Sequence, residues 1–204
     1  MNYYSLFILL AVGMLIFVTQ KNLAHLFNHE FFWKLAFFTL LFSLVGAKIF
    51  HIIENFSFYS ISPNLIFSGF GFSVLGAITF GYLTIFFFSI VYKTNFSHIT
   101  DRVFLITPIA QFIGRIGNIT NQELMPFSIY EMGLNLVNFV ILLFATTKYK
   151  KIDGLVTALF FLNYGLIRLY IEILKQNYLG FLTLVSFIFF VYGVSKLSKI
   201  IFKI

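Results

Sequence analysis

Residues 101–124 read DRVFLITPIAQFIGRIGNITNQEL and combine two kinds of sequence. The first part is an apolar run of the length that a membrane-spanning helix needs. The second part places Arg115, Asn118, Asn121 and Glu123 within nine residues. Charged side chains are costly in hydrocarbon unless they have partners or a function. The stretch therefore predicts a transmembrane helix that ends in a polar site.

The composition extends this pattern to the whole chain. Of its 204 residues, 60% are hydrophobic and 10% are charged, whereas a soluble domain is about half apolar and a quarter charged. We therefore expect an all-α polytopic membrane protein in which residues 1–204 form one integral-membrane domain. The net charge of +7 is then attributed to basic residues that flank the spans and meet lipid headgroups, and not to a nucleic-acid surface.

Apolar runs between polar breaks predict seven transmembrane helices. Their expected bounds are about 3–19, 34–54, 65–92, 102–119, 126–147, 154–174 and 179–197. The third run contains SGFGFSVLG (68–76), which predicts a broken or re-entrant segment before a regular helix from about residue 75. Pro108 is expected to kink the fourth helix. The first run lacks a basic leader and a cleavage site, so we read it as a retained span.

The basic residues predict an orientation. With the N-terminus outside, ten of the 14 basic residues fall in cytoplasmic loops, and only Lys175 falls in an outer loop. This asymmetry follows the positive-inside rule and places the C-terminus in the cytoplasm. At the inner ends, Asp101 with Arg102 is expected to cap its own helix, and Asp153 with Gly154 to start the next but one.

The three remaining cations, Lys48, Arg115 and Arg168, lie inside spans. Their helices are predicted to begin near residues 34, 101 and 154, so each cation lies 14 residues along, or about 21 Å at 1.5 Å per residue. All three would lie in the outer half of the bilayer. Equal depth predicts a shared polar cavity that opens toward the outer leaflet.

Carboxylates are available to pair with these cations. Glu123, Glu131 and Glu172 are all predicted near the outer ends of their helices. The charges are either structural ion pairs that lock the helices together or a site for an anionic headgroup, because arginine binds phosphate through two parallel hydrogen bonds. Depth alone does not distinguish a lipid enzyme from a lipid transporter or an anion pathway.

The sequence offers little for metal or thiol chemistry. It contains no cysteine, which excludes disulfides, thiolate nucleophiles and iron–sulfur ligation by this chain. The four histidines lack the spacing of metal ligands. We therefore expect neither a metal nor a cofactor.

Several motifs resemble those of the prolipoprotein diacylglyceryl transferase family. GRIGNITNQEL (114–124) resembles the family pattern G-R-x-G-N-F-x-N-x-E, and MPFSIYE (125–131) resembles H-P-x-x-L-Y-E. VGAKIFHI (45–52) resembles G-A-R-x-x-Y, and GLVTALFFLNYGLIRLYIEILKQ (154–176) followed by LGFLT resembles the penultimate helix and its exit. The resemblance covers nearly the whole chain in the family order.

This resemblance implies an activity and its partners. The family moves the diacylglyceryl group of phosphatidylglycerol onto the thiol of a lipobox cysteine in the signal peptide of a prolipoprotein, and glycerol 1-phosphate leaves. No metal or nucleotide is used, and the nucleophile belongs to the substrate. The implied location is the bacterial cytoplasmic (inner) membrane. The protein would cross this membrane several times and contact its lipids.

The resemblance also implies roles for the residues that match the family motifs. Arg115 and Arg168 would stabilise charge on the leaving phosphate, with Tyr164 one turn before Arg168 bracing its guanidinium or donating to the phosphate. The residues expected to bind substrate are Asn118, Asn121, Glu123, Lys48, Tyr130 and Glu131.

The sequence departs from the family at one catalytic motif. The family carries His-Gly-Gly in the third span, where this chain has GFSVLGA (71–77). His51, one turn after Lys48, is a possible substitute base, although a lone histidine near an interface is more often structural. The connection at about 55–64 is also too short for the family's added extracytoplasmic segment. A phospholipid-binding paralogue without this activity, or with another acceptor, therefore stays open beside the transferase. A transporter or channel is a third reading, but no inverted repeat is visible.

Overall fold

The computed structural model describes residues 4–67, 71–149 and 152–202, and these residues are predominantly helical. Parts of the span and orientation predictions fall outside the described residues. They concern Tyr3, residues 68–70, Lys150, Lys151 and Lys203. The elements are α1 (Tyr4–Leu23), α2 (His29–Glu54), α3 (Phe56–Ile61), the 3₁₀ helix η1 (Pro63–Phe67), α4 (Val74–Val91), α5 (Phe96–Thr120), α6 (Phe127–Lys148), α7 (Leu155–Leu174) and α8 (Phe181–Ile201).

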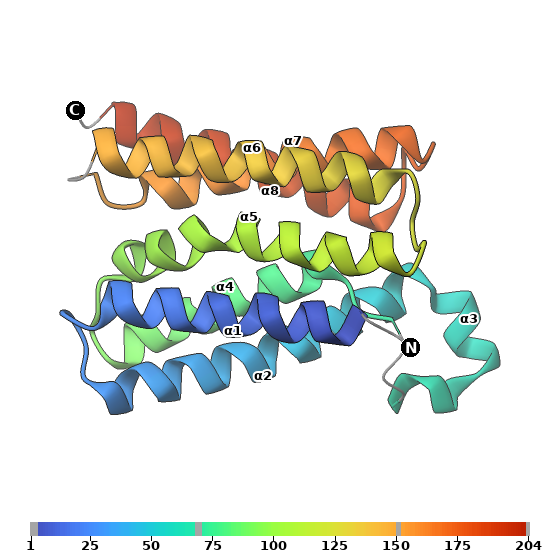
Figure 1. The fold of residues 1–204 in the computed structure, drawn as a ribbon, viewed down its shortest axis with the longest axis horizontal. Helices are drawn as coiled ribbons and strands as arrows, with labels where there is room; N and C mark the ends of the chain where they lie inside the picture. The colour runs from blue at the N-terminus through green and yellow to red at the C-terminus, as the bar shows by residue number, and fades with distance from the viewer. Residues whose placement is uncertain (1–3, 68–70, 150–151, 203–204) are drawn as a thin grey trace.

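The predicted all-α fold is confirmed. Seven of these helices, α1, α2 and α4 to α8, are long and apolar enough to cross a membrane. Figure 1 shows them running roughly along one axis, with α1 starting and α8 finishing at opposite ends of the bundle. The short helix α3 lies at the end of the bundle where α1 starts.

Two helices begin earlier than predicted because asparagines cap them. The side chain of Asn28 accepts a hydrogen bond of 2.8 Å from the backbone N–H of Phe31, so α2 begins at His29. Asn95 accepts one of 3.1 Å from His98 N–H, and α5 begins at Phe96. An asparagine at this position satisfies a backbone donor that the helix itself leaves unpaired. The apolar runs alone underestimated both helices.

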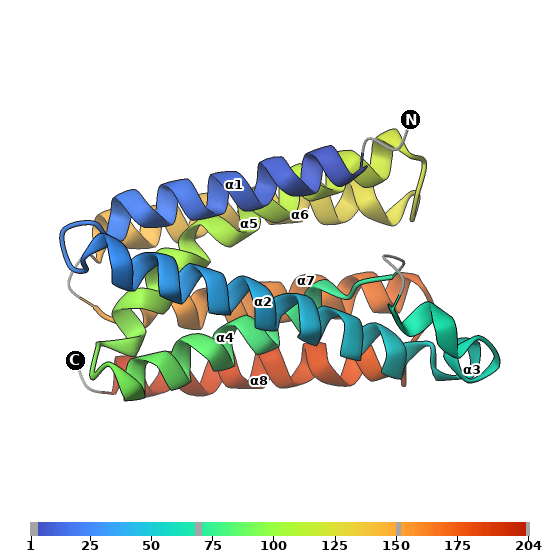
Figure 2. The same cartoon turned by 90° about the horizontal axis from the view of Figure 1, so that it is seen from below.

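The third predicted span is interrupted, as the glycine-rich stretch indicated. Residues 63–67 form the 3₁₀ helix, and the regular helix α4 begins at Val74. The prediction of one span from residue 65 is therefore wrong, and that of a regular helix from about 75 is confirmed. Around Pro108, α5 remains one continuous helix, and Figure 2 shows that it bends along its length.

Glycines allow two helix pairs to pack closely. A Cβ added at Gly76 of α4 would lie 2.3 Å from the carbonyl oxygen of Gly46 in α2. Likewise, a Cβ at Gly193 of α8 would lie 2.3 Å from the backbone nitrogen of Leu162 in α7. Small residues at such crossings bring backbones into contact where no hydrophobic effect drives helices together. Figure 1 shows α5 between the group of α1, α2 and α4 and the group of α6, α7 and α8.

The prediction that Asp101 caps its own helix is wrong. Asp101 lies within α5 and caps the N-terminus of α7 instead. Its carboxylate accepts hydrogen bonds of 2.7 Å from Gly154 N–H and of 2.8 Å from Thr157 N–H, and one of 2.5 Å from the Thr157 hydroxyl. Negative charge is favourable at a helix N-terminus because unpaired backbone N–H groups point there. Asp101 therefore fixes the first turn of α7 against α5.

Candidate active site

Two arginines from different helices meet on one carboxylate. Arg115 of α5 places Nη2 2.7 Å from Oε2 of Glu131 in α6, and Arg168 of α7 places Nη1 3.0 Å from the same oxygen. Arg168 also places Nη2 2.7 Å from Oε1 of Glu172, one turn further along α7. Two of the three cations predicted at equal depth, Arg115 and Arg168, thus meet on a carboxylate that was expected within their reach, and the group joins three helices.

An amide arm extends this group toward the connection between α5 and α6. The Arg115 guanidinium donates a hydrogen bond of 3.0 Å to the side-chain oxygen of Asn118. Asn118 in turn donates to Glu123 over 3.2 Å, and Asn121 donates to the other oxygen of Glu123 over 3.3 Å. Arg115, Asn118, Asn121 and Glu123 thus form one chain of hydrogen bonds at the end of α5.

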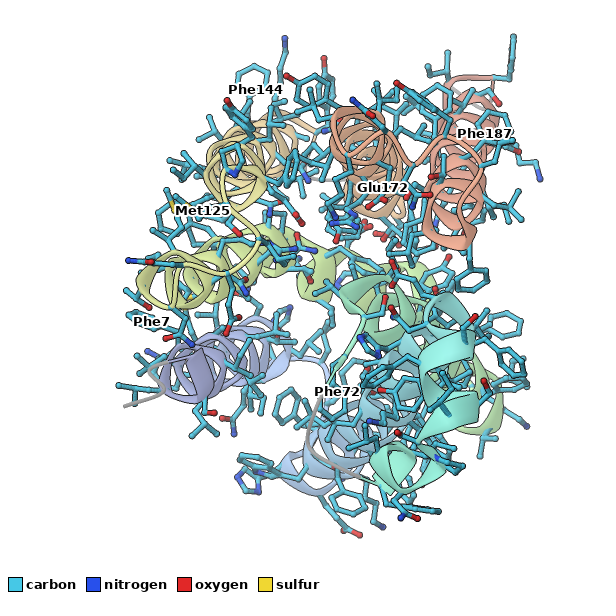
Figure 3. All side chains as sticks on the ribbon, turned by 90° about the vertical axis from the view of Figure 1, so that its right-hand side faces the viewer. Phe7, Phe72, Met125, Phe144, Glu172 and Phe187 are labelled. Atoms are coloured by element: carbon cyan, nitrogen blue, oxygen red, sulfur yellow. The ribbon has the colours of Figure 1, made fainter. Side chains whose placement is uncertain are left out.

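A second arm reaches the connection between α7 and α8. Glu172 accepts from Asn177 over 3.0 Å, and Lys175 Nζ lies 3.4 Å from its other oxygen. Figure 3 looks onto this end of the bundle, with Glu172 on α7 and Met125 in the connection between α5 and α6. Asn177 was not among the residues predicted for the site, because nothing in its local sequence marks it as a partner of Glu172.

The centre of the network is shielded from solvent. The side chains of Arg115, Glu131, Arg168 and Glu172 are 12%, 4%, 7% and 1% exposed. Charges removed from water to this degree are tolerated only when they are paired and hydrogen-bonded, since the desolvation cost is several kcal/mol per ion. The alternating cations and anions provide that pairing. The same shielding strengthens any electrostatic contact made to a ligand that enters.

Two donors at the centre keep spare capacity. The hydroxyl of Tyr164 and the Nε of Arg168 are buried and have no hydrogen-bond partner among the described residues. Tyr164 is fully buried, and its ring stacks on Phe160 with ring centroids 5.5 Å apart. The packing therefore holds the phenol one turn before Arg168. Unpaired buried donors are rare in folded proteins, and they point to a ligand or water that completes the site.

An apolar cavity of about 260 Å³ adjoins the network. It lies between α1, α2, α4 and α5, and Arg115, Asn118 and Glu131 line it together with many apolar side chains. The cavity thus combines a charged end with a hydrocarbon-like interior. Such a combination suits an amphiphile with an anionic head and apolar chains.

Two predicted site residues form a second cluster. Lys48 and His51, on α2, both hydrogen-bond to the hydroxyl of Tyr59, over 3.3 and 2.9 Å. Lys48 also donates to the carbonyl of Leu65 over 3.1 Å. Lys48 thus contributes to the connection after α2, and the structure gives it no place in the Glu131 ion pairs. Tyr130, the remaining predicted site residue, is exposed on α6.

Comparison with known proteins identifies the family. The family profile described as prolipoprotein diacylglyceryl transferase matches residues 1–198. The chain belongs to this family. The ion-pair network therefore lies within the matched region of a prolipoprotein diacylglyceryl transferase fold.

Individual relatives carry the same description. The chain is 32% identical over 160 residues to the phosphatidylglycerol–prolipoprotein diacylglyceryl transferase of Rickettsia africae, a match that covers 65% of this chain and 62% of that protein. It is 30% identical to the enzyme of Fervidobacterium nodosum over 69% of this chain and 59% of that protein, and 28% identical to that of Thermotoga maritima over 87% and 71%. The chain thus spans less than two thirds of the Rickettsia and Fervidobacterium proteins.

Proposed function

We propose that this chain transfers the diacylglyceryl group of phosphatidylglycerol to the thiol of a lipobox cysteine in the signal peptide of a prolipoprotein. The observation that carries the proposal is the meeting of Arg115 and Arg168 on Glu131 beside an apolar cavity. Family membership and the names of the relatives support the choice of lipid donor and protein acceptor.

The reaction needs charge stabilisation more than any other help. The substrate sulfur forms a bond to the glyceryl carbon that bears the phosphate ester, the C–O bond to phosphate breaks, and the electron pair leaves with glycerol 1-phosphate. Negative charge grows on that phosphate as the bond breaks. Arg115 and Arg168 supply cations that are already oriented, and preorganised charge of this kind is often the largest catalytic contribution. An arriving phosphate would share these guanidiniums with Glu131 and use the spare donors of Arg168 and Tyr164.

We assign roles to the remaining predicted site residues as well. Asn118, Asn121 and Glu123 would hold the glycerol hydroxyls of the headgroup and orient the lipid. Tyr130, exposed beside the site, would contact the lipid or the acceptor. The thiol proton must pass to a base, and we assign that role to His51, whose ring bonds to Tyr59. Lys48 would attract the anionic donor to this side of the bundle.

We place the protein in the bacterial cytoplasmic membrane with its N-terminus outside. The seven apolar helices support a multi-pass arrangement, and the excess of lysine and arginine at one side supports the orientation. The site would then open toward the outer leaflet, where an exported signal peptide arrives. Reporter fusions at the two ends of the chain test this orientation, and a cytoplasmic N-terminus would contradict it.

A transfer assay tests the activity. Purified full chain would be mixed with phosphatidylglycerol and a lipobox peptide, and the mass of the peptide measured. We expect a diacylglyceryl mass shift that disappears in Arg115→Ala and Arg168→Ala but persists in Arg102→Ala, an arginine of α5 near its other end. Full activity in both site variants would refute the proposal.

The same assay separates the transferase from the alternative paralogue. If no product forms while phosphatidylglycerol still binds in an Arg115-dependent way, the chain is a lipid-binding protein without this activity. Replacing the cysteine of the peptide by serine controls for thiol attack. His51→Ala would then report on the base: if the rate stays unchanged, His51 is structural, bound to Tyr59.

A further inference from the structure

The cavity beside the ion-pair network has a polarity gradient along α5. One face of this helix lines it, through residues that repeat with the helical period: Val103, Phe104, Thr107, Ala110, Gln111, Gly114, Arg115 and Asn118. The charged and amide side chains lie at the network end, and Thr107, Phe104 and Val103 lie at the other. The lined face extends about 22 Å at 1.5 Å per residue, most of a bilayer's ~30 Å hydrocarbon core.

Gln111 lies between the charged and the apolar parts of this face. It precedes Arg115 by one helical turn, on the same side of α5, and therefore lies about 6 Å further from the network end. Both polar atoms of its side-chain amide are buried and have no hydrogen-bond partner among the described residues. Gln111 is one of the residues that line the cavity, and the free rotation of its side-chain bonds would let the amide turn toward a bound molecule.

The amide of Gln111, buried and without a partner among the described residues, indicates that a ligand supplies a hydrogen-bonding group there. Buried polar groups are nearly always hydrogen-bonded, and leaving one unpaired is unfavourable. A glycerophospholipid with its phosphate at Arg115 places its ester carbonyls a few bonds further in, and its acyl chains beyond them. The cavity has the same order: cation, amide, hydrocarbon-like wall. Ester carbonyls only accept hydrogen bonds, and the Gln111 amide nitrogen can donate them.

We propose that Gln111 binds an ester carbonyl of the diacylglyceryl group and makes the site selective for ester-linked over ether-linked lipid. This inference rests on the proposed function, because it takes phosphatidylglycerol as the donor. An ether lipid has the same phosphate and chains but lacks the carbonyl. It would leave the Gln111 amide unpaired in a buried place, and sites built to hydrogen-bond a substrate group discriminate against analogues that lack it.

Asn135 provides a matched control for this residue. It follows Glu131 by one turn on α6, is fully buried, and also has an amide without a partner among the described residues. Among those residues, however, the cavity lining includes Gln111 and not Asn135. Replacing Asn135 therefore removes a comparable buried amide near the network without touching the face that holds the lipid.

The experiment compares two donors on purified full chain. Phosphatidylglycerol with ester-linked chains and its dialkyl ether analogue with chains of equal length would each be given with the lipobox peptide. We expect the wild type to use the ester about tenfold more efficiently, in kcat/KM, than the ether. Gln111→Met, which keeps the shape of the side chain, should lose about tenfold with the ester and little with the ether. Asn135→Leu should keep the preference.

Several results would overturn the inference. Equal use of the two lipids by the wild type, or an unchanged preference in Gln111→Met, would show that Gln111 does not bind the ester. A preference lost equally in Asn135→Leu would point to a general disturbance of the bundle. Thermal unfolding of each variant checks that it is folded.

Failure of the proposed function would give a different result. If the wild type transfers neither lipid, retention of the two lipids by the purified protein is compared by native mass spectrometry. Ester-selective retention that Gln111→Met abolishes supports the role of Gln111 even without transfer. Equal retention of ester and ether lipid contradicts it.

Discussion

Asp101 and Arg168 are charged side chains held at opposite ends of α7, and their surroundings differ. Asp101 accepts three hydrogen bonds from Gly154 and Thr157, and the hydroxyl oxygens of Thr157 and Thr100 lie 2.9 Å apart. At the other end, Arg168 pairs with two carboxylates, but its Nε and the hydroxyl of Tyr164 stay without partners among the described residues.

The difference indicates which buried charge is structural and which is functional. Asp101 uses its hydrogen-bonding capacity on a helix N-terminus, so its role is to position α7. The Arg168 end keeps buried donors without a partner among the described residues, a condition that lowers stability unless something binds there. Substitutions at the Asp101 end should therefore change stability, and substitutions at the Arg168 end should change transfer.

The largest expected effect is on catalysis at Arg115. Arg115→Ala should lower the transfer rate about 10²- to 10³-fold, because it removes an oriented cation from the leaving phosphate. Arg115→Lys keeps the charge without the planar fork and should lose less. Rates from the peptide mass-shift assay measure both. Equal losses in the two variants would show that geometry, and not charge, limits the reaction.

The next effect is on stability at Asp101. Asp101→Ala removes the acceptor for three hydrogen bonds and should lower the free energy of unfolding by about 2–3 kcal/mol. Transfer per folded molecule should stay the same, because the site lies at the far end of α7. Thermal unfolding in detergent and the transfer assay are the two measurements. A large loss of rate in folded protein would remove the distinction between the two ends.

A smaller effect is expected at Tyr164. Tyr164→Phe deletes a hydroxyl that has no partner among the described residues, so the melting temperature should stay equal or rise. Transfer should fall at least about tenfold if the hydroxyl donates to the phosphate, since a hydrogen bond to a charged group contributes about 1.5–3 kcal/mol. A drop in stability with unchanged transfer would instead place Tyr164 among the structural residues.

The smallest effect concerns the partner of Asp101. Thr157→Val removes one hydroxyl and leaves both backbone N–H groups of the cap in place, and should cost about 1 kcal/mol of stability. Combining it with Asp101→Ala should cost less than the sum of the two, because they share an interaction. Additive losses would mean that Thr157 stabilises α7 by another route.

The spans were predictable because the length of an apolar run reflects bilayer thickness. Their ends were less so, since Asn28 and Asn95 extend α2 and α5 into polar sequence through their caps. The partner of Asp101 was not predictable, because Gly154 lies 53 residues away and nothing local indicates the contact.

The sequence predicts how far along its helix each site residue lies, but it does not predict the direction in which each side chain points. Arg115 and Arg168, which were expected at equal depth, meet on Glu131. Lys48 has the same expected depth, yet its helix α2 packs mainly on α4, and its side chain bonds to Tyr59. Depth fixes position along the bundle and leaves rotation about each helix undetermined. Tyr130 is exposed beside the buried Glu131 for the same reason, since neighbouring residues on a helix point in different directions.

The hydrogen bonds of Asp101 also fix the distance between α5 and α7 at one end of the two helices. Asp101 and Gly154 lie 14 residues before Arg115 and Arg168, so both guanidiniums lie about 21 Å from the point where α5 and α7 are pinned. If α5 and α7 tilted relative to each other by about 5° at this contact, the separation of the two guanidiniums would change by about 2 Å. Because Arg115 and Arg168 are both paired with Glu131 at this far end, their separation is set there as well as at the Asp101 contact.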